Sequence, residues 1–305
     1  MSPVTLPLLI RTRTLLSAAV LATALALVAA YTGSPAGRAS GASRHYGTAV
    51  PVGAGYARAY VLYAAGDSGA PVEIGVALDE RALENLPAPN PHAPRTSPGG
   101  HEHVDNHPYL LSLPEQGAPP YRFVELDWNP GGHEPPGIYD TPHFDFHFYT
   151  VPPSERAAIV PSDPRFQEKA DRLPPERERP ESYVVAAPPG APAPAVPLMG
   201  VHWVDVGSPE LQGMFGKPEA YRPFTRTFIY GSWNGRFHFV EPMITRAHLL
   251  DKKNAVDPAE RDEVVAVPMA PSYSTPGYYP GAYRITWDDE TKEWRVALTK
   301  LVRRD

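Results

Sequence analysis

The segment PHFDFHFY, residues 142–149, alternates polar and aromatic side chains without a break from His143 to Tyr149. A period of two is typical of a β-strand, because successive side chains of a strand point to opposite faces of its sheet. One face would carry Phe144, Phe146 and Phe148, and the other would carry His143, Asp145, His147 and Tyr149. The first face suits a hydrophobic core, whereas the second suits a metal site or a proton-transfer site.

Related patterns elsewhere in the chain favour a protein made mostly of strands. Strand-like segments occur at 56–65, 71–79, 121–128, 200–206, 224–232, 236–244 and 283–301. The 305 residues include 39 prolines and 24 glycines, and proline at this density breaks helices and limits strand length. Asn234-Gly235 predicts a type I′ hairpin turn. We therefore predict an all-β fold with one or two short helices, arranged as an antiparallel sandwich or a barrel-like single domain.

Helices and loops are expected in few places. Residues 79–86 predict one short helix, with Asp79 as its N-cap and Leu83 and Leu86 at helical spacing. A second short helix is expected within 154–173. Residues 87–108 are rich in proline and polar residues and are expected to form a loop.

The N-terminus predicts export of the protein. Arg11 and Arg13 precede an uncharged apolar run that ends near Ala30, which is typical of a secretory signal peptide cleaved before Tyr31. The alternative is a retained membrane anchor, since the run is marginally long enough for a span. We expect a signal peptide at 1–30, a flexible tether at 31–55 and a β-rich domain at 56–301, with a Pro/Ala-rich insertion at about 165–198. The mature protein would be secreted, periplasmic or part of the cell envelope, without a stable membrane span.

Composition narrows the possible chemistry and partners. The chain has no cysteine, so it has neither disulfides nor thiolate metal ligands. Removing Arg11 and Arg13 with the signal changes the formal net charge from −6 to −8. Because no basic patch is present, nucleic acid and anionic membranes are poor partners. Any protein ligand of a metal must be nitrogen or oxygen.

Two later strands offer groups that could complete a site with the polar face of 143–149. His202 lies in GVHWVD, residues 200–205, and Glu241 follows Phe237 and Phe239 on one expected face of RFHFVEPMI, residues 236–244. A carboxylate on an apolar face is costly to bury alone, so Glu241 should be paired, metal-bound or protonated.

Strand geometry limits how the site can be assembled. Residues two apart on a strand are about 6.5–7 Å apart, so His143 and His147 are separated by about 13 Å unless the strand bends. We predict His143, His147, His202 and Glu241 as ligands of a divalent metal, with Zn²⁺ as the first choice. Glu241 is alternatively the general base, and Asp145 is either a base or a group that orients a histidine.

Three function classes remain open on these residues. The first is a metal-dependent hydrolase or lyase acting on a small substrate. The second is a non-catalytic envelope or stress-response binding protein that forms oligomers, in which the polar face would be a buried network or a subunit contact. The third is a small-molecule carrier, which would need an apolar cavity lined by tyrosine and phenylalanine. For any single histidine, a hydrogen-bonded structural role is the alternative to metal binding.

Several long motifs resemble one family. They are GVALDERALENLP, GGHEPPGIYDTPHFDFHFY, GVHWVD and FTRTFIYGSWNGRFHFVEPMIT. Together they resemble a family of exported bacterial proteins of unknown function whose structural representative comes from Thermus. The resemblance covers about residues 56–301 and implies a β-rich fold and assembly into a homo-oligomer of higher order, in a ring-like form. It implies no particular reaction and no catalytic residues.

Overall fold

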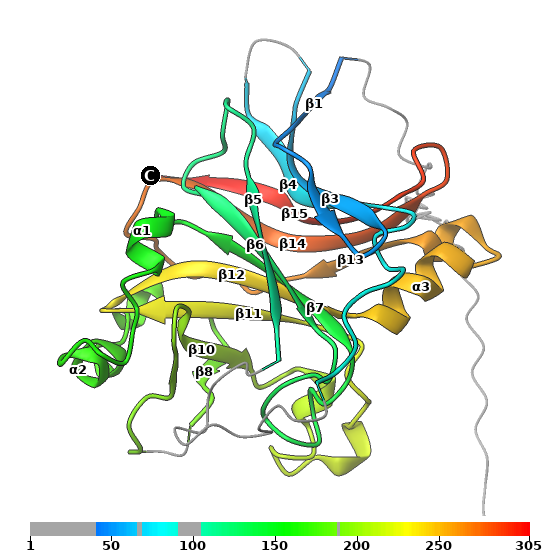
Figure 1. The fold of residues 1–305 in the computed structure, drawn as a ribbon. Coiled ribbons are helices and arrows are strands. Elements are labelled where there is room, and N and C mark those ends of the chain that lie inside the picture. The colour runs from blue at the N-terminus through cyan, green and yellow to red at the C-terminus, as the bar shows by residue number, and fades with distance from the viewer. Residues whose placement is uncertain (1–40, 66–68, 91–104, 188–189) are drawn as a thin grey trace, which may run out of the picture. The chain divides into compact units, whose positions relative to one another are not determined.

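Two antiparallel sheets pack face to face, as Figure 1 shows. Apolar side chains from both sheets form the core between them. The computed structural model describes residues 41–65, 69–90, 105–187 and 190–305, which all belong to one compact unit. Within these residues the prediction of an all-β antiparallel sandwich is confirmed, and neither sheet closes into a barrel. The signal peptide predicted at residues 1–30 lies outside the described part of the chain.

The first sheet has the neighbour order β1-β3-β4-β15-β14-β13, with β2 paired to β3. Its strands are β1 (Ser43–Tyr46), β2 (Val50–Val52), β3 (Gly55–Tyr63), β4 (Pro71–Asp79), β13 (Asp262–Ala266), β14 (Gly277–Asp288) and β15 (Glu293–Arg304). The strand-like segment at 283–301 falls within the long antiparallel hairpin of β14 and β15.

The second sheet carries the polar segment and has the order β5-β6-β7-β12-β11-β10-β8, with β9 paired to β10. Its strands are β5 (His107–Ser112), β6 (Phe123–Asn129), β7 (His143–Tyr149), β8 (Tyr183–Val185), β9 (Ala195–Val196), β10 (Gly200–Asp205), β11 (Arg226–Trp233) and β12 (Arg236–Thr245). Asn234 and Gly235 have φ values of 50° and 88° between β11 and β12, which is the type I′ geometry that their sequence predicts.

The helices are short and lie in the connections. They are α1 (Pro153–Arg156), α2 (Phe166–Asp171) and α3 (Arg246–Asn254), and short 3₁₀ turns accompany them. α1 and α2 fall in the range where one short helix was expected. The Pro/Ala-rich insertion expected at about 165–198 contains α2, β8 and β9, and β8 extends the second sheet by pairing with β10. None of the helices in the described residues combines the length and apolarity that a membrane crossing requires.

The core lies between the sheets and contains the aromatic face of β7. Phe144, Phe146 and Phe148 are all 0% exposed and pack with residues of the first sheet such as Val76 and Val296. Each such side chain contributes roughly 1.5–3 kcal/mol by leaving water. This burial fixes which face of β7 points inward, and therefore places its polar face on the opposite side of the second sheet.

Two local predictions were wrong for identifiable reasons. Asp79 ends β4 and residues 80–85 form turns and bends rather than a helix. The Asp79 carboxylate accepts a hydrogen bond from the backbone N–H of Tyr56 at 3.0 Å instead of capping a helix. Residues 43–46 and 50–52 lie within the expected tether but pair with β3 as β1 and β2. Contacts across the sheet, which the local polar composition does not reveal, hold these strands.

A β-bulge places Phe237 on a different face of the second sheet from the one expected. The pairing of β11 with β12 shifts register between Gly231 and Ser232, and a bulge of this kind redirects side chains. Phe237 therefore packs with Trp203 in the core, whereas Phe239 lies on the polar side against His147. The expectation that Phe237, Phe239 and Glu241 share one face is wrong for Phe237.

Candidate metal centre

The polar face of β7 is buried as completely as its phenylalanine face. His143, Asp145 and His147 are each 0% exposed. Connecting segments cover them, with Tyr139, Leu211 and Phe224 packed against Met243, and with Val151, Val196 and Met199 packed against Tyr149. A charged or polar surface enclosed in this way needs internal partners, because burying such groups without them is costly.

Strand β6 supplies a second row of polar groups beside β7. The register pairs Glu125 with His147, Asp127 with Asp145, and Asn129 with His143. All three β6 side chains are at most 1% exposed. The two strands thus place six polar residues on one buried face, and β12 and β10 approach from the other side of β7.

The first group of converging side chains, termed the His147 cluster, consists of His147, His202 and Glu241. Its candidate ligand atoms all lie within 4.8 Å of one another. Glu241 Oε1 is 3.5 Å from His147 Nε2, and Glu241 Oε2 is 3.7 Å from His202 Nε2. Zn²⁺ bonds of about 2.0–2.1 Å would put neighbouring ligand atoms of a tetrahedral site about 3.3 Å apart. The cluster therefore has the dimensions of a site for one small cation.

Groups around the His147 cluster fix its orientation. His147 Nδ1 lies 3.1 Å from Asp127 Oδ2, and Asp127 accepts a hydrogen bond from Asn106 through its other oxygen at 3.1 Å. The ring of Phe239 packs against both His147 and His202, with centroids 5.0 and 5.4 Å apart. A carboxylate that holds the far nitrogen of a metal-binding histidine is the usual outer partner in such sites.

Burial strongly perturbs the ionisation of this cluster. Burial and the charge of Asp145 raise the pKa of Glu241 to about 8, although His147 opposes the shift. Burial alone would lower the pKa of His147, but Glu241 and Asp127 raise it to about 10. Burial and the charge of His147 lower the pKa of His202 to about 3. His202 is therefore neutral at pH 7, which is the form of imidazole that binds metals.

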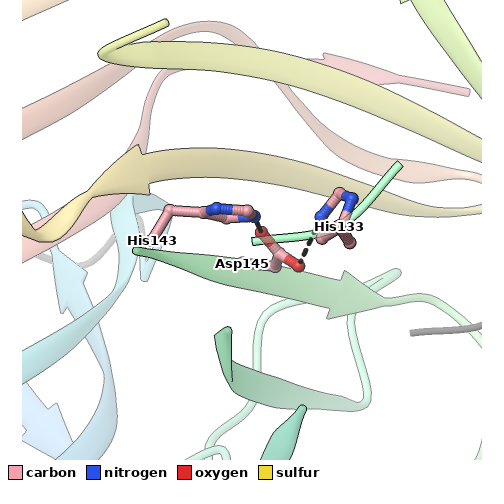
Figure 2. Close-up of side chains that lie close together, drawn as sticks. All are labelled: His133, His143 and Asp145. Carbon is pink, nitrogen blue, oxygen red and sulfur yellow. Dashed lines mark ion pairs between the residues drawn. The ribbon is translucent and has the colours of Figure 1, made fainter. Parts of the chain in front are cut away.

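The second group, termed the His143 cluster, consists of His133, His143 and Asp145. Figure 2 shows the two rings approaching the Asp145 carboxylate from different sides, with one oxygen facing each ring. His143 Nε2 is 3.1 Å from Oδ1, and His133 Nε2 is 3.4 Å from Oδ2. Burial alone would raise the pKa of Asp145, but the two histidines hold it well below its usual value.

Glu125, Asp127 and His147 form a third grouping of possible ligands that shares a residue with the His147 cluster. Glu125 is ion-paired with Arg156 at the end of α1, so a cation already balances its charge. Burial and the charge of Asp127 raise the pKa of Glu125 to about 7, and Arg156 opposes the shift. Asp127 and Glu125 therefore serve better as supports of His147 than as a separate metal site.

The structure divides the predicted site residues between two clusters. It brings together His147 from β7, His202 from β10 and Glu241 from β12. His143 lies instead with Asp145 and His133. Strand spacing explains this division, because His143 and His147 lie four residues apart on β7 and are too distant to share an ion. The metal-binding and catalytic roles of these residues stay predictions.

Strand β6 contributes three polar residues to this face that the sequence patterns did not predict as site residues, namely Glu125, Asp127 and Asn129. The signal was present, because FVELDWN places Glu, Asp and Asn at alternate positions, the same spacing as the polar residues of HFDFHFY. What a single sequence does not contain is the register that sets Glu125 opposite His147.

Comparison with known proteins finds a similarity to one family over part of the chain and assigns no activity. Residues 66–128 match the sequence model of the TTHB210-like family, described as hypothetical protein TTHB210. The matched range contains β4, β5 and most of β6, including Glu125 and Asp127. This match confirms the resemblance to a family of unknown function with a Thermus representative. No curated protein and no solved structure matches the chain.

Proposed function

We propose that this protein binds a divalent metal ion, with Zn²⁺ as the first choice, through His147, His202 and Glu241. We further propose that it uses the ion in a hydrolase or lyase reaction on a small substrate outside the cytoplasm. The observation that carries the proposal is the convergence of two imidazoles and one carboxylate, from three separate strands, within 4.8 Å. Two histidines and a carboxylate form a ligand set of catalytic zinc sites, which keep a fourth position for water.

The state of Glu241 supports a cation at this position. Its side chain is buried, and neither carboxylate oxygen has a hydrogen-bond partner in the described residues. A buried carboxylate without hydrogen bonds is costly, and a bound cation would remove this cost. Because both oxygens already lie within 3.7 Å of a histidine nitrogen, Glu241 fits the role of a ligand better than that of a general base.

The residues around the ligands divide the remaining tasks. A bound divalent ion would acidify a coordinated water and so supply a nucleophile near neutral pH. Asp127 would hold His147 in the tautomer that presents Nε2 to the ion. The side chain of His202 is 18% exposed, so the approach of solvent and of a small substrate would be from the β10 side.

A specific observation favours a non-catalytic metal-binding protein as the second candidate. A small pocket is lined by Tyr121, Thr150, Tyr230, His238 and Phe239 among others, but by none of the three proposed ligands. A metal that is enclosed without a neighbouring substrate cavity would serve structure or ion storage. In that case the family resemblance to an oligomeric envelope protein would be the better guide to function.

Metal analysis of protein purified without a histidine tag tests the proposal. We expect the wild type to hold ion at the His147 cluster, and His202→Gln and Glu241→Gln to lose one ion equivalent. His238→Gln is the matched control, because His238 is also buried in β12 but contacts the carbonyl of Met199 at 2.7 Å. Equal metal content in wild type and His202→Gln would contradict the site.

Catalysis is tested separately on the same proteins. We expect ester hydrolysis or carbon dioxide hydration by the wild type, loss of this activity in His202→Gln, and retention in His238→Gln. Ion bound at the His147 cluster without any such activity would favour the non-catalytic candidate.

A further inference from the structure

We propose that the His143 cluster is a second divalent-cation site, so that one chain holds two separate ions on the polar face of its second sheet. The ligands are His133 Nε2, His143 Nε2 and the carboxylate of Asp145. This inference goes beyond the proposed function and does not depend on an ion at the His147 cluster.

Backbone carbonyls fix the tautomers of both histidines. His143 Nδ1 contacts the carbonyl oxygen of Thr141 at 2.6 Å, and His133 Nδ1 contacts the carbonyl oxygen of Glu134 at 2.8 Å. A carbonyl oxygen only accepts hydrogen bonds, so each Nδ1 must carry the proton. In a neutral ring the other nitrogen, Nε2, then presents a lone pair.

Both lone pairs face the same carboxylate. His143 Nε2 is 3.1 Å from Asp145 Oδ1, and His133 Nε2 is 3.4 Å from Oδ2. Dashed lines mark both ion pairs in Figure 2. Acceptor atoms at such distances in a buried site repel one another unless a cation lies between them. His143 Nε2 is buried without a well-formed hydrogen bond, which is the arrangement that a coordinated ion would complete.

Geometry favours one divalent ion over two protons as that cation. If both rings were protonated, two positive imidazolium rings would lie with centroids 4.6 Å apart, and the single carboxylate of Asp145 would have to balance both. Like charges at this distance disfavour each other strongly in a buried site. A single divalent ion would satisfy both lone pairs and the carboxylate at once.

The supporting contacts of this cluster resemble those of a metal site. Asn129, which is 1% exposed, donates a hydrogen bond to Asp145 Oδ2 at 2.8 Å and fixes the carboxylate plane. Each of the three ligands therefore has an outer partner that orients it, which is the usual property of metal ligands in proteins. The rings of Tyr139 and Phe224 pack on His133 and His143 and shield the site from water.

The two clusters are adjacent but would hold independent ions. Asp145 and His147 are two residues apart on β7, which separates their backbones by about 6.5–7 Å. Ions that share a bridging ligand lie about 3.5–4 Å apart, so the clusters are too widely spaced for a bridged pair. The donor set of two imidazoles and a carboxylate suits Zn²⁺ or Fe²⁺.

The stoichiometry of Zn²⁺ binding tests this inference. The full chain is stripped with chelator, reloaded with Zn²⁺ alone, freed of excess ion and analysed for metal. His92, His101 and His103 lie outside the described residues, so all measurements use a background in which these three are alanine. We expect two ions per chain in this background and in the control His238→Gln, and one ion in His133→Ala.

Three further variants keep the result interpretable. His202→Gln should also retain one ion, and the double variant His133→Ala/His202→Gln should retain none. Asp145→Asn, which preserves side-chain shape, should lose the same ion as His133→Ala, and circular dichroism checks that both variants fold.

The outcomes separate this site from the proposed one. If the triple-alanine background binds only one ion, and this ion is lost in His133→Ala but retained in His202→Gln, the His143 cluster is supported as a site. The same result would contradict the site proposed at the His147 cluster. Unchanged metal content in both His133→Ala and Asp145→Asn would overturn the inference.

Discussion

The two faces of the second sheet are equally buried but have opposite chemistry. On β6 and β7 every residue is buried, so alternation along these strands separates two kinds of interior rather than interior from solvent. The inner face packs phenylalanines against the first sheet. The outer face places histidines and carboxylates under connecting segments, where no hydrophobic gain repays their desolvation.

This difference indicates that the faces serve different ends. Apolar burial is the main source of folding stability, and the inner face provides it. Buried ion pairs are weak evidence for stability, because desolvation offsets much of their attraction. A fold that nevertheless encloses His147, Glu241 and their neighbours has a use for these groups other than stability, and the proposed ion binding would account for their arrangement.

The largest expected effect of a single substitution is on the inner face. Phe146→Ala should lower the free energy of unfolding by about 4 kcal/mol, because it opens a cavity in a fully buried core. Urea denaturation measures this change, and Leu110→Ala, at a side chain that is 54% exposed, is the control that should change little. The metal content of folded Phe146→Ala should equal that of the wild type, and a loss of ion would break the separation of the two faces.

Ion removal should act through the outer face. At a free metal concentration about 100 times the dissociation constant, each bound ion stabilises the native state by about 2.7 kcal/mol. Excess chelator should therefore lower the stability of the wild type and of Phe146→Ala by the same amount. A chelator effect that persists in His133→Ala/His202→Gln would show that the ions bind elsewhere.

The charged cluster around Glu263, which is separate from the two candidate metal clusters, provides a contrast with the polar face of the second sheet. Burial alone would raise the pKa of Glu263, but hydrogen bonds from His248 and Lys252 and the charge of Arg226 lower it to about 2. Glu263→Gln should cost about 2 kcal/mol at pH 7 through loss of charged hydrogen bonds. This cluster already contains its own cations, so chelator should leave the cost unchanged.

The sign of the pH dependence follows from that lowered pKa. The unfolded chain binds a proton at Glu263 near pH 4.5, whereas the folded chain does so only near pH 2. The stability that Glu263 contributes is therefore complete above pH 4.5 and is lost as the pH falls towards 2. Denaturation at several pH values should show the difference between wild type and Glu263→Gln shrinking over this range, and a constant difference would contradict the assignment.

The smallest expected effect concerns a polar contact on the inner face. Trp203 donates a hydrogen bond from Nε1 to Ser232 Oγ at 2.8 Å in a buried position. Ser232→Ala should lower stability by about 1 kcal/mol without altering metal content. A change in bound ion would show that the two faces are coupled through β10 and β11.

Much of the fold could be predicted from the sequence, because alternation and turn residues are local signals. HFDFHFY and the Asn234-Gly235 turn identified their strands and hairpin directly. The turns at 80–85 and the strand β1 were missed because contacts with distant β3 decide them. Such contacts leave no local pattern to read.

The candidate metal site was also predictable only in part, because some of its residues give local signals and others depend on contacts between strands. Glu241 was predictable because it follows aromatic residues along a strand, where a buried carboxylate is costly. His147 and His202 were predictable because each lies among apolar residues of a strand. The grouping of His143 with His133 depends on the path of residues 130–142, and the role of Asp127 depends on the β6–β7 register. Neither is encoded by spacing along one strand.

Anomalous diffraction at the zinc absorption edge, from crystals of untagged protein, tests the central claim most directly. We predict a peak within bonding distance of His147 Nε2, His202 Nε2 and Glu241, on the outer face of the second sheet. Clear density in which these atoms contact only water or one another, with no anomalous signal after crystals are soaked in Zn²⁺, would contradict the account.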